Sequence, residues 1–403
     1  VIIILINNSG GGIFSFLPIA NHKEVFEKYF ATPHDIIFKS AADLFKLNYY
    51  SPQSSTEFVN NYKSALNENK SALIEKAFYT NANLYLEKSN KTLWTVPVKE
   101  YASWYKNKKE GEFTGRIGNI LSIDNFEGVA TAKAEIIIPK SGLRYIDLFL
   151  LKKIENDWKI ISKTASSEKS NQNGDKILFI VSNASFHGTT KLPTGNSFSE
   201  IVNAYDTFKK EGFTVDFVSP NGGSIPLAYI NTSDALQKKL LYSEDFMYAL
   251  KHTKKPKEII AKDYKAVHYI GGGSAMYDVP KNKEIQKITM TIFEEYNGIV
   301  SSVCHGTAGI VNLKTKDGKY LVNNKIISGY PEAYEKEGAE YFKQFPFLIQ
   351  KTIEERGGIF KYSPRNSVHV EVQGNVITGQ NYLSSKDVAL KIIENLNNRQ
   401  VSQ

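Results

Sequence analysis

One short segment, GIVSSVCHGTAGIV at residues 298–311, carries residue types that could perform nucleophilic chemistry. An apolar stretch ends at Cys304, His305 follows it directly, and small residues occupy 306–309. A thiol between a strand and a helix has the geometry of a nucleophile elbow, and the helix dipole is expected to make it ionise more easily. The adjacent imidazole could accept or return a proton. The alternative is that Cys304 is a small buried hydrophobic residue.

This segment needs a strand before it and a sheet around it, and the second half of the chain supplies both. Repeated strand and helix units with apolar strands predict an α/β domain with a doubly wound, flavodoxin-like parallel sheet. Ligands of such sheets lie at the carboxyl ends of the strands, where Cys304 and a glycine run at 271–273 both fall. The expected strands are 177–181, 214–219, 266–270 and 299–303, and the expected helices are 198–208 and 285–296.

The first half has a different periodicity, with helical spacing first and alternation afterwards. Helices followed by a strand meander predict an α+β domain with a curved antiparallel sheet. The helical spacing covers 25–30, 58–66 and 73–78, and the strands are expected at 92–98, 118–123, 129–138, 145–154 and 158–164.

The polar run SSEKSNQNGD at 166–175 has no apolar anchor and separates the two halves. We therefore expect a leader or truncated signal segment at 1–22, the α+β domain at 23–166, a linker at 167–174 and the α/β domain at 175–398. The apolar opening stretch is too broken to span a bilayer. If residues 1–20 are a truncated signal peptide, the protein is exported, and otherwise it is cytoplasmic.

Composition excludes several classes of protein. The chain has 403 residues and a formal charge of +8, but five arginines stand among 50 basic residues and the lysines are scattered, so no nucleic acid is expected as a partner. The single cysteine excludes an internal disulfide. If Cys304 matters, it matters as a thiol.

Five motifs in the second half together resemble one superfamily. They begin with PTGNSFSEIVNAYDTFKKEGFTVDFVSPNGGSIPL and continue with YIGGGSAMYDVP, VCHGTAG, IISGYPEAYEK and VITGQNYLSSKDVA. In this order they resemble the ThiJ/PfpI superfamily, which has a class I glutamine-amidotransferase-like fold, and its branch of heat-shock-protein-31-like chaperones and cofactor-independent glyoxalases. Residues 175–398 would then be the catalytic domain.

The resemblance implies a set of site residues. Cys304 matches the nucleophile, His305 the adjacent proton shuttle, Glu332 the acid that orients the histidine, and Glu200 the carboxyl that hydrogen-bonds the sulfur. A carboxyl beside a thiolate should have a raised pKa, so that its protonated form can donate to sulfur. The backbone amides around Gly272 and Gly273 could receive an oxyanion.

The sequence departs from the resemblance at one motif. Many members of this branch carry a histidine in the glycine motif, as GGHG, whereas residues 271–273 here are all glycine and Ser274 follows. Gly273 replaces that histidine and removes a metal ligand or polar contact, so no metal and no cofactor are expected. His187, in the first loop, is expected to have no special role.

In the first half, RIGNILSIDNFEGVATAKAEIIIP and YIDLFLLKKIENDWKIISKTAS resemble the nuclear-transport-factor-2-like cone fold, in its lumazine-binding-like branch. Such a cone can be a ligand pocket, an enzyme site or a dimerisation module. We expect a homodimer.

The resemblance as a whole predicts a cofactor-independent thiol enzyme of the glyoxalase III or deglycase type. It would act on small reactive aldehydes such as methylglyoxal, through a hemithioacetal on Cys304. Two alternatives stay open: a cysteine amidase or peptidase of the same superfamily, and a stress chaperone or redox sensor in which Cys304 is oxidised.

Overall fold

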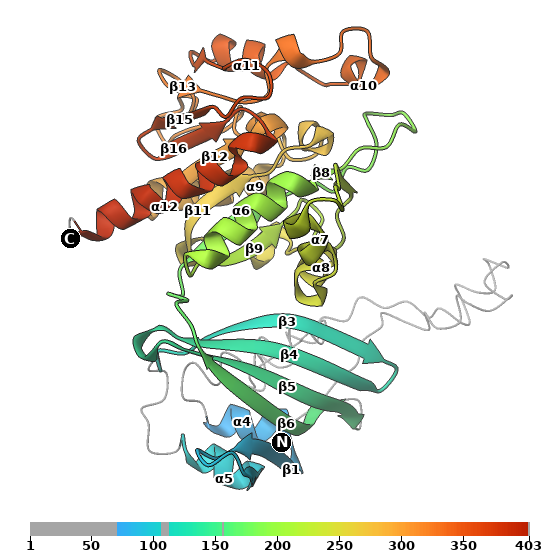
Figure 1. The fold of residues 1–403 in the computed structure, drawn as a ribbon, viewed down its shortest axis with the longest axis vertical. Coiled ribbons are helices and arrows are strands. Elements are labelled where there is room, and N and C mark those ends of the chain that lie inside the picture. The colour runs from blue at the N-terminus through green and yellow to red at the C-terminus, as the bar shows by residue number, and fades with distance from the viewer. Residues whose placement is uncertain (1–70, 106–112, 155–156, 402–403) are drawn as a thin grey trace, which may run out of the picture.

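The computed structural model describes residues 71–105, 113–154 and 157–401 and contains two six-stranded sheets (Figure 1). The expected leader at 1–22 and the helices expected at 25–30 and 58–66 lie outside the described residues. The chain passes from the first sheet to the second between Lys169 and Lys176.

The N-terminal sheet has the strand order β2-β1-β6-β5-β4-β3. All neighbouring strands are antiparallel except β1 and β6, which are parallel, so the sheet that was expected to be antiparallel is mixed. The strands are β1 (Phe78–Glu87), β2 (Leu93–Pro97), β3 (Ile117–Phe126), β4 (Val129–Ile138), β5 (Leu143–Ile154) and β6 (Asp157–Lys169), accompanied by helices α4 (Ser71–Ala77) and α5 (Val98–Ser103).

Strand β1 was not expected from the sequence. The helical spacing predicted over 73–78 stops at Ala77, and the chain continues as a strand from Phe78. Within that strand Ala82 and Leu84 are buried while Asn83 and Tyr85 face outward, which is strand alternation. Since Asn81 and Asn83 interrupt the apolar pattern, the alternation is too short to be evident in the sequence.

The C-terminal sheet has the order β15-β16-β12-β11-β7-β9 and is parallel except at β15, which pairs antiparallel with β16 at the edge. The predicted parallel sheet is therefore also mixed. The strands are β7 (Lys176–Ile180), β9 (Thr214–Val218), β11 (Tyr264–Tyr269), β12 (Ile299–Val303), β15 (Val370–Gln373) and β16 (Val376–Gly379); the main helices are α6 (Phe198–Lys210), α9 (Lys283–Glu295), α11 (Ile349–Glu355) and α12 (Ser385–Val401).

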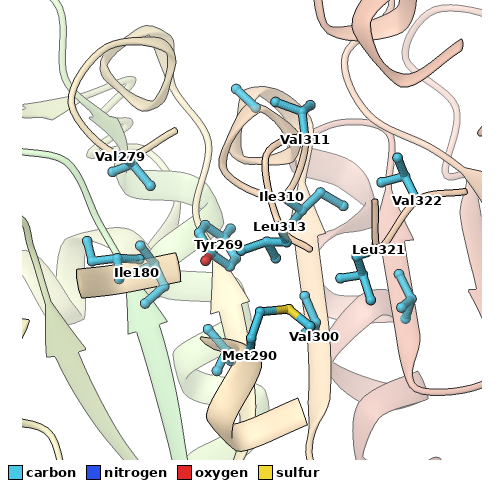
Figure 2. Packing of buried hydrophobic residues seen from close by; sticks show 14 of the residues in the cluster. Ile180, Tyr269, Val279, Met290, Val300, Ile310, Val311, Leu313, Leu321 and Val322 are labelled. Atoms are coloured by element: carbon cyan, nitrogen blue, oxygen red, sulfur yellow. The ribbon is translucent and has the colours of Figure 1, made fainter. Parts of the chain in front are cut away.

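Both faces of this second sheet are buried. Along β7, Ile177 and Phe179 pack with residues of α6 and α12, whereas Leu178 and Ile180 belong to a second apolar cluster that includes residues of α9. Figure 2 shows part of the second cluster, in which Tyr269 of β11 lies near Ile310 and Leu313. The segment that follows Cys304 is therefore anchored in the core, which fixes the position of the turn before it.

The junction between the two halves is more ordered than a polar linker. Strand β6 continues to Lys169, so the expected linker at 167–174 begins inside a strand. Gln172 is buried, and its side chain donates to Glu135 on β4 at 3.0 Å. Across the junction, Lys133 forms a 2.8 Å ion pair with Asp245 on α8 (Glu244–Lys251).

Candidate active site

Cys304 occupies a strained turn at the carboxyl end of β12. Its φ is +55°, a left-handed conformation that residues with a side chain seldom adopt and that clusters at functional sites. The residues 304–309 form a six-residue 3₁₀ helix instead of the expected α-helix. The strand, the sharp turn and the helical start together have the geometry of a nucleophile elbow.

Close backbone packing holds this turn. A Cβ on Gly306 would lie 2.3 Å from the carbonyl oxygen of Tyr269, so only glycine allows the turn to approach β11 this closely. A Cβ on Gly271 would lie 2.7 Å from Glu200 Oε2 and 2.9 Å from Cys304 Cβ. The first residue of the glycine run therefore brings the carboxyl and the thiol together.

His305 links the thiol to a carboxylate. Its Nδ1 lies 3.5 Å from Cys304 Sγ, and its Nε2 lies 2.7 Å from Glu335 Oε1. With Nε2–H donating to the carboxylate, Nδ1 presents a lone pair to the sulfur. All three side chains are largely buried. The arrangement can accept the thiol proton and stabilise the resulting imidazolium.

The acid that contacts the histidine is Glu335, whereas the resemblance implied Glu332. The Glu332 carboxylate instead accepts a hydrogen bond from the backbone N–H of Lys351, at 3.1 Å, in the first turn of α11. Helix α11 has no side-chain cap at Leu348, so Glu332 satisfies free N–H groups of its first turn.

Glu335 is held in place from two sides. Its backbone N–H donates to the Glu332 carbonyl oxygen and closes a 3₁₀ turn, and Tyr341 Oη donates to its Oε2 at 2.9 Å. The motif PEAYEKEG contains three glutamates, and the resemblance pointed to Glu332, whereas Glu335 is the one that contacts the histidine.

Glu200 lies beside the sulfur, as the resemblance implied. It is 1% exposed, in the first turn of α6, and it accepts a 2.8 Å hydrogen bond from the Gly271 backbone N–H. Burial raises the pKa of Glu200 to about 7, although hydrogen bonds from Gly271 and Cys304 oppose the shift. Near neutral pH this carboxyl can therefore hold a proton next to Cys304.

The pKa of the Cys304 thiol differs from what the sequence predicts. Burial, and secondarily the charge of Glu200, raise the pKa of Cys304 well above its usual range, whereas the elbow pattern predicted an easily ionised thiol. The 3₁₀ turn is short, and the loss of hydration outweighs its dipole. The resting thiol is therefore protonated, and its proton has to leave as a bond forms, with His305 as the nearest base.

The remaining glycines and an aromatic wall complete the site. No described residue accepts a hydrogen bond from the backbone N–H of Gly272 or Gly273. Tyr330 stacks on His305 with ring centroids 4.7 Å apart, and its backbone N–H donates to the Cys304 carbonyl oxygen. His187, for which the sequence predicts no special role, is buried close to Gly273.

Two further observations concern the described residues only. Within 71–105, 113–154 and 157–401, no cluster of three or more His, Cys, Asp or Glu side chains could hold a metal ion. In the same part of the chain, no helix is long and apolar enough to cross a membrane.

The fold and site together define an α/β protein of the ThiJ/PfpI type with a cysteine at a nucleophile elbow. Residues 193–395 match the family described as the DJ-1/PfpI family. This match covers half of the chain, and the chain belongs to the DJ-1/PfpI family. Residues 53–166 match the family described as putative lumazine-binding. Both resemblances drawn from the sequence are confirmed.

The relatives agree with this placement. The chain is 32% identical over 213 residues to the glutathione-independent glyoxalase hsp3102 of Schizosaccharomyces pombe, covering 49% of this chain and 86% of that protein. It is 31% identical over 219 residues to the glutathione-independent glyoxalase HSP31 of Saccharomyces cerevisiae, covering 51% and 90%. Among solved structures, glyoxalase III from Candida albicans superposes with a TM-score of 0.50 at 25% identity, covering 55% of this chain and 97% of that chain.

Proposed function

We propose that this protein is a cofactor-independent glyoxalase of the glyoxalase III type, which converts 2-oxoaldehydes such as methylglyoxal to 2-hydroxy acids. The observation that carries the proposal is the continuous contact from Cys304 Sγ through His305 to Glu335, with the Glu200 carboxyl beside the sulfur. The names of the yeast relatives support the substrate class.

In the first step, Cys304 Sγ attacks the aldehyde carbon and a C–S bond forms. His305 Nδ1 accepts the thiol proton, and Glu335 stabilises the imidazolium. The proton then passes to the former aldehyde oxygen, which gives a hemithioacetal. Backbone N–H groups around Gly272 and Gly273 are proposed to receive the oxygen while it is negatively charged. Glu200 in its protonated form donates to the sulfur and stabilises the negative charge that develops there as the thiol proton leaves.

In the second step, His305 moves a proton from the former aldehyde carbon to the adjacent carbon. The C1–H bond breaks and a C2–H bond forms, while the proton of the C1 hydroxyl passes to the C2 oxygen. C1 thereby becomes the carbonyl of a thioester and C2 carries the hydroxyl of lactate. Water then cleaves the thioester, releasing lactate and returning the thiol. No electrons leave the substrate, since the reaction is an internal oxidation and reduction, and no redox cofactor is required.

The test is lactate formation from methylglyoxal in the absence of glutathione. Purified protein is expected to produce lactate, and Cys304→Ala is expected to produce none above the uncatalysed rate. Equal lactate production by the two proteins, or none by the wild type, would reject the proposal.

We also propose that the chain divides into domains at the junction between β6 and β7, with a cone-shaped N-terminal domain and a doubly wound C-terminal domain that holds the whole site. Separate buried clusters in the two halves support this division. The N-terminal domain is proposed as a pocket or dimerisation module. Light scattering should give about twice the 45.3 kDa chain mass for the intact protein and the single mass if the dimer is wrong.

A further inference from the structure

His187 shares an aromatic wall with the His305–Glu335 pair. Its ring lies 6.2 Å from Phe345 and 5.6 Å from Tyr341, centroid to centroid. Phe345 in turn contacts the His305 ring at 5.5 Å, and Tyr341 donates to Glu335. A histidine from the loop before α6 therefore lies against the same aromatic side chains as the candidate site.

The ring of His187 also lies over the glycine run. A Cβ on Gly273 would meet His187 Cε1 at 2.7 Å and Nε2 at 3.4 Å. Any side chain at 273 would displace this ring. Gly273, which stands where the GGHG motif has histidine, thus leaves space that an imidazole from a distant loop fills.

The contacts of His187 identify which ring nitrogen carries its proton. Nδ1 lies 2.9 Å from Tyr277 Oη, and that oxygen accepts a hydrogen bond from the Gly188 backbone N–H. Burial raises the pKa of Tyr277 to about 12, so the hydroxyl keeps its proton. Among the described residues His187 Nδ1 is the one acceptor within hydrogen-bond distance of that hydroxyl, so the hydroxyl donates to Nδ1. Burial, and then the charge of His305, lower the pKa of His187 and keep the ring neutral. The single ring proton is therefore on Nε2, and no described residue accepts it.

We infer that His187 Nε2–H donates a hydrogen bond to the ketone oxygen of a 2-oxoaldehyde bound to Cys304, and so selects dicarbonyl substrates over simple aldehydes. The inference rests on the proposed function. When a proton leaves C1 of the hemithioacetal, negative charge develops on the neighbouring oxygen, and an N–H beside Gly273 stabilises it. A simple aldehyde has no oxygen at that carbon.

His187→Phe tests this role because phenylalanine keeps the ring contacts and removes the N–H. We expect kcat/KM for methylglyoxal to fall about 10²-fold, mainly through kcat. His187→Gln, which restores an N–H donor, should recover part of the loss, and thermal unfolding reports whether both variants fold. His252→Phe, an exposed histidine stacked on Tyr248, is the matched control and should behave as wild type. A kcat/KM within about threefold of wild type for His187→Phe would overturn the inference.

A second readout separates this inference from the proposed function. Aldehydes that form an adduct with Cys304 slow its alkylation by iodoacetamide. His187→Phe should weaken protection by methylglyoxal about fivefold and leave protection by propanal unchanged. Equal weakening for both aldehydes, or for neither, would overturn the role of His187. If the wild type forms no lactate, the proposed function fails, whereas this comparison still tests His187 because it measures only adduct formation.

Discussion

At the residue scale, His305 lies between a thiol and a carboxylate, and each of its two ring nitrogens has one partner. The Glu335 carboxylate fixes the ring so that Nδ1 faces Cys304. Removing the negative charge from Glu335 should leave the ring in place but destabilise the imidazolium that forms when the thiol loses its proton.

Glu335→Gln is therefore expected to lower kcat/KM for methylglyoxal by about 10²-fold. Glu332→Gln is the matched control, because Glu332 lies three positions earlier and contacts the first turn of α11 instead of the histidine. It should lower stability slightly and leave kcat within about twofold of wild type. The reverse ranking of the two variants would show that the histidine partner is Glu332.

The raised pKa of the buried Glu200 carboxyl predicts how the stability of the protein depends on pH. Its pKa is about 7 in the folded protein against an ordinary value of 4.5. Between these pH values the folded state holds a proton that the unfolded chain releases, so this contribution to stability is complete below about pH 4.5 and is lost as pH rises through about 7.

Glu200→Gln is uncharged at every pH, so its stability should not fall in this way as the pH rises through about 7. The unfolding free energy of the variant relative to wild type should rise between about pH 4.5 and about pH 7, by on the order of 3 kcal/mol. Denaturant unfolding at several pH values measures it, with the exposed Glu394→Gln as control. A difference that stays constant with pH would contradict a protonated Glu200.

The site residues differ in how far the sequence could predict them. Cys304 and His305 directly follow strand β12, and Glu200 lies in the first turn of α6. The sequence pattern of these two elements was enough to predict the positions of the three residues. Glu335 could not be chosen over Glu332, because the choice depends on where α11 begins. The proposed role of His187 could not be predicted, because it depends on the Tyr277 hydroxyl and on the missing side chain at Gly273, both distant in sequence.

At the element scale, the turn after β11 depends on a glycine whose backbone conformation other residues seldom adopt. Gly272 has φ +95° and ψ 157°, a region that only glycine adopts readily. A Cβ there would lie 2.3 Å from the carbonyl oxygen of Gly195 and 2.6 Å from the backbone nitrogen of Ser197. The glycine thus allows the loop before α6, which precedes Glu200, to approach the turn.

Gly272→Ala should lower the free energy of unfolding by about 3 kcal/mol or more, because backbone strain and backbone contacts act together. Gly318→Ala is the control: its φ is also positive, at +81°, but a Cβ there would meet nothing within 4 Å. It should cost about 1 kcal/mol. If thermal or denaturant unfolding showed the same loss of stability for both variants, the close approach of the loop before α6 to Gly272 would contribute nothing to stability.

Strands and helices were predicted well where the apolar pattern had one clear period. β7, β9, β11 and β12 are almost wholly buried, and apolar residues predominate in each of them. Strand pairing was harder to predict from the sequence. The parallel pairing of β1 with β6 and the antiparallel pairing of the edge strand β15 with β16 both depend on long-range packing.

At the scale of the whole molecule, a buried carboxylate stabilises the junction of the two halves. Glu135 is 2% exposed and binds Arg144 at 2.6 Å and Gln172 at 3.0 Å. Burial opposes its ionisation, but Lys209 of α6 and these two side chains outweigh burial and lower the pKa of Glu135. The charge therefore links β4 to the C-terminal half.

Glu135→Gln should lower the free energy of unfolding by on the order of 2 kcal/mol and leave kcat for methylglyoxal unchanged, since the candidate site lies wholly beyond residue 175. Glu168→Gln is the matched control, because Glu168 also binds Arg144 at 2.6 Å but is exposed. It should cost less than about 1 kcal/mol. A fall in kcat for Glu135→Gln with the fold intact would show that the N-terminal half contributes to turnover.

The most direct test of the central claim is the mass of the protein during a single turnover of methylglyoxal without glutathione. Acid quenching at short times should trap wild-type protein carrying one added methylglyoxal on Cys304. The adduct should disappear as an equal amount of lactate appears, and Cys304→Ala should show neither. Lactate accumulating while Cys304 stays unmodified, or at the same rate in Cys304→Ala, would contradict the account.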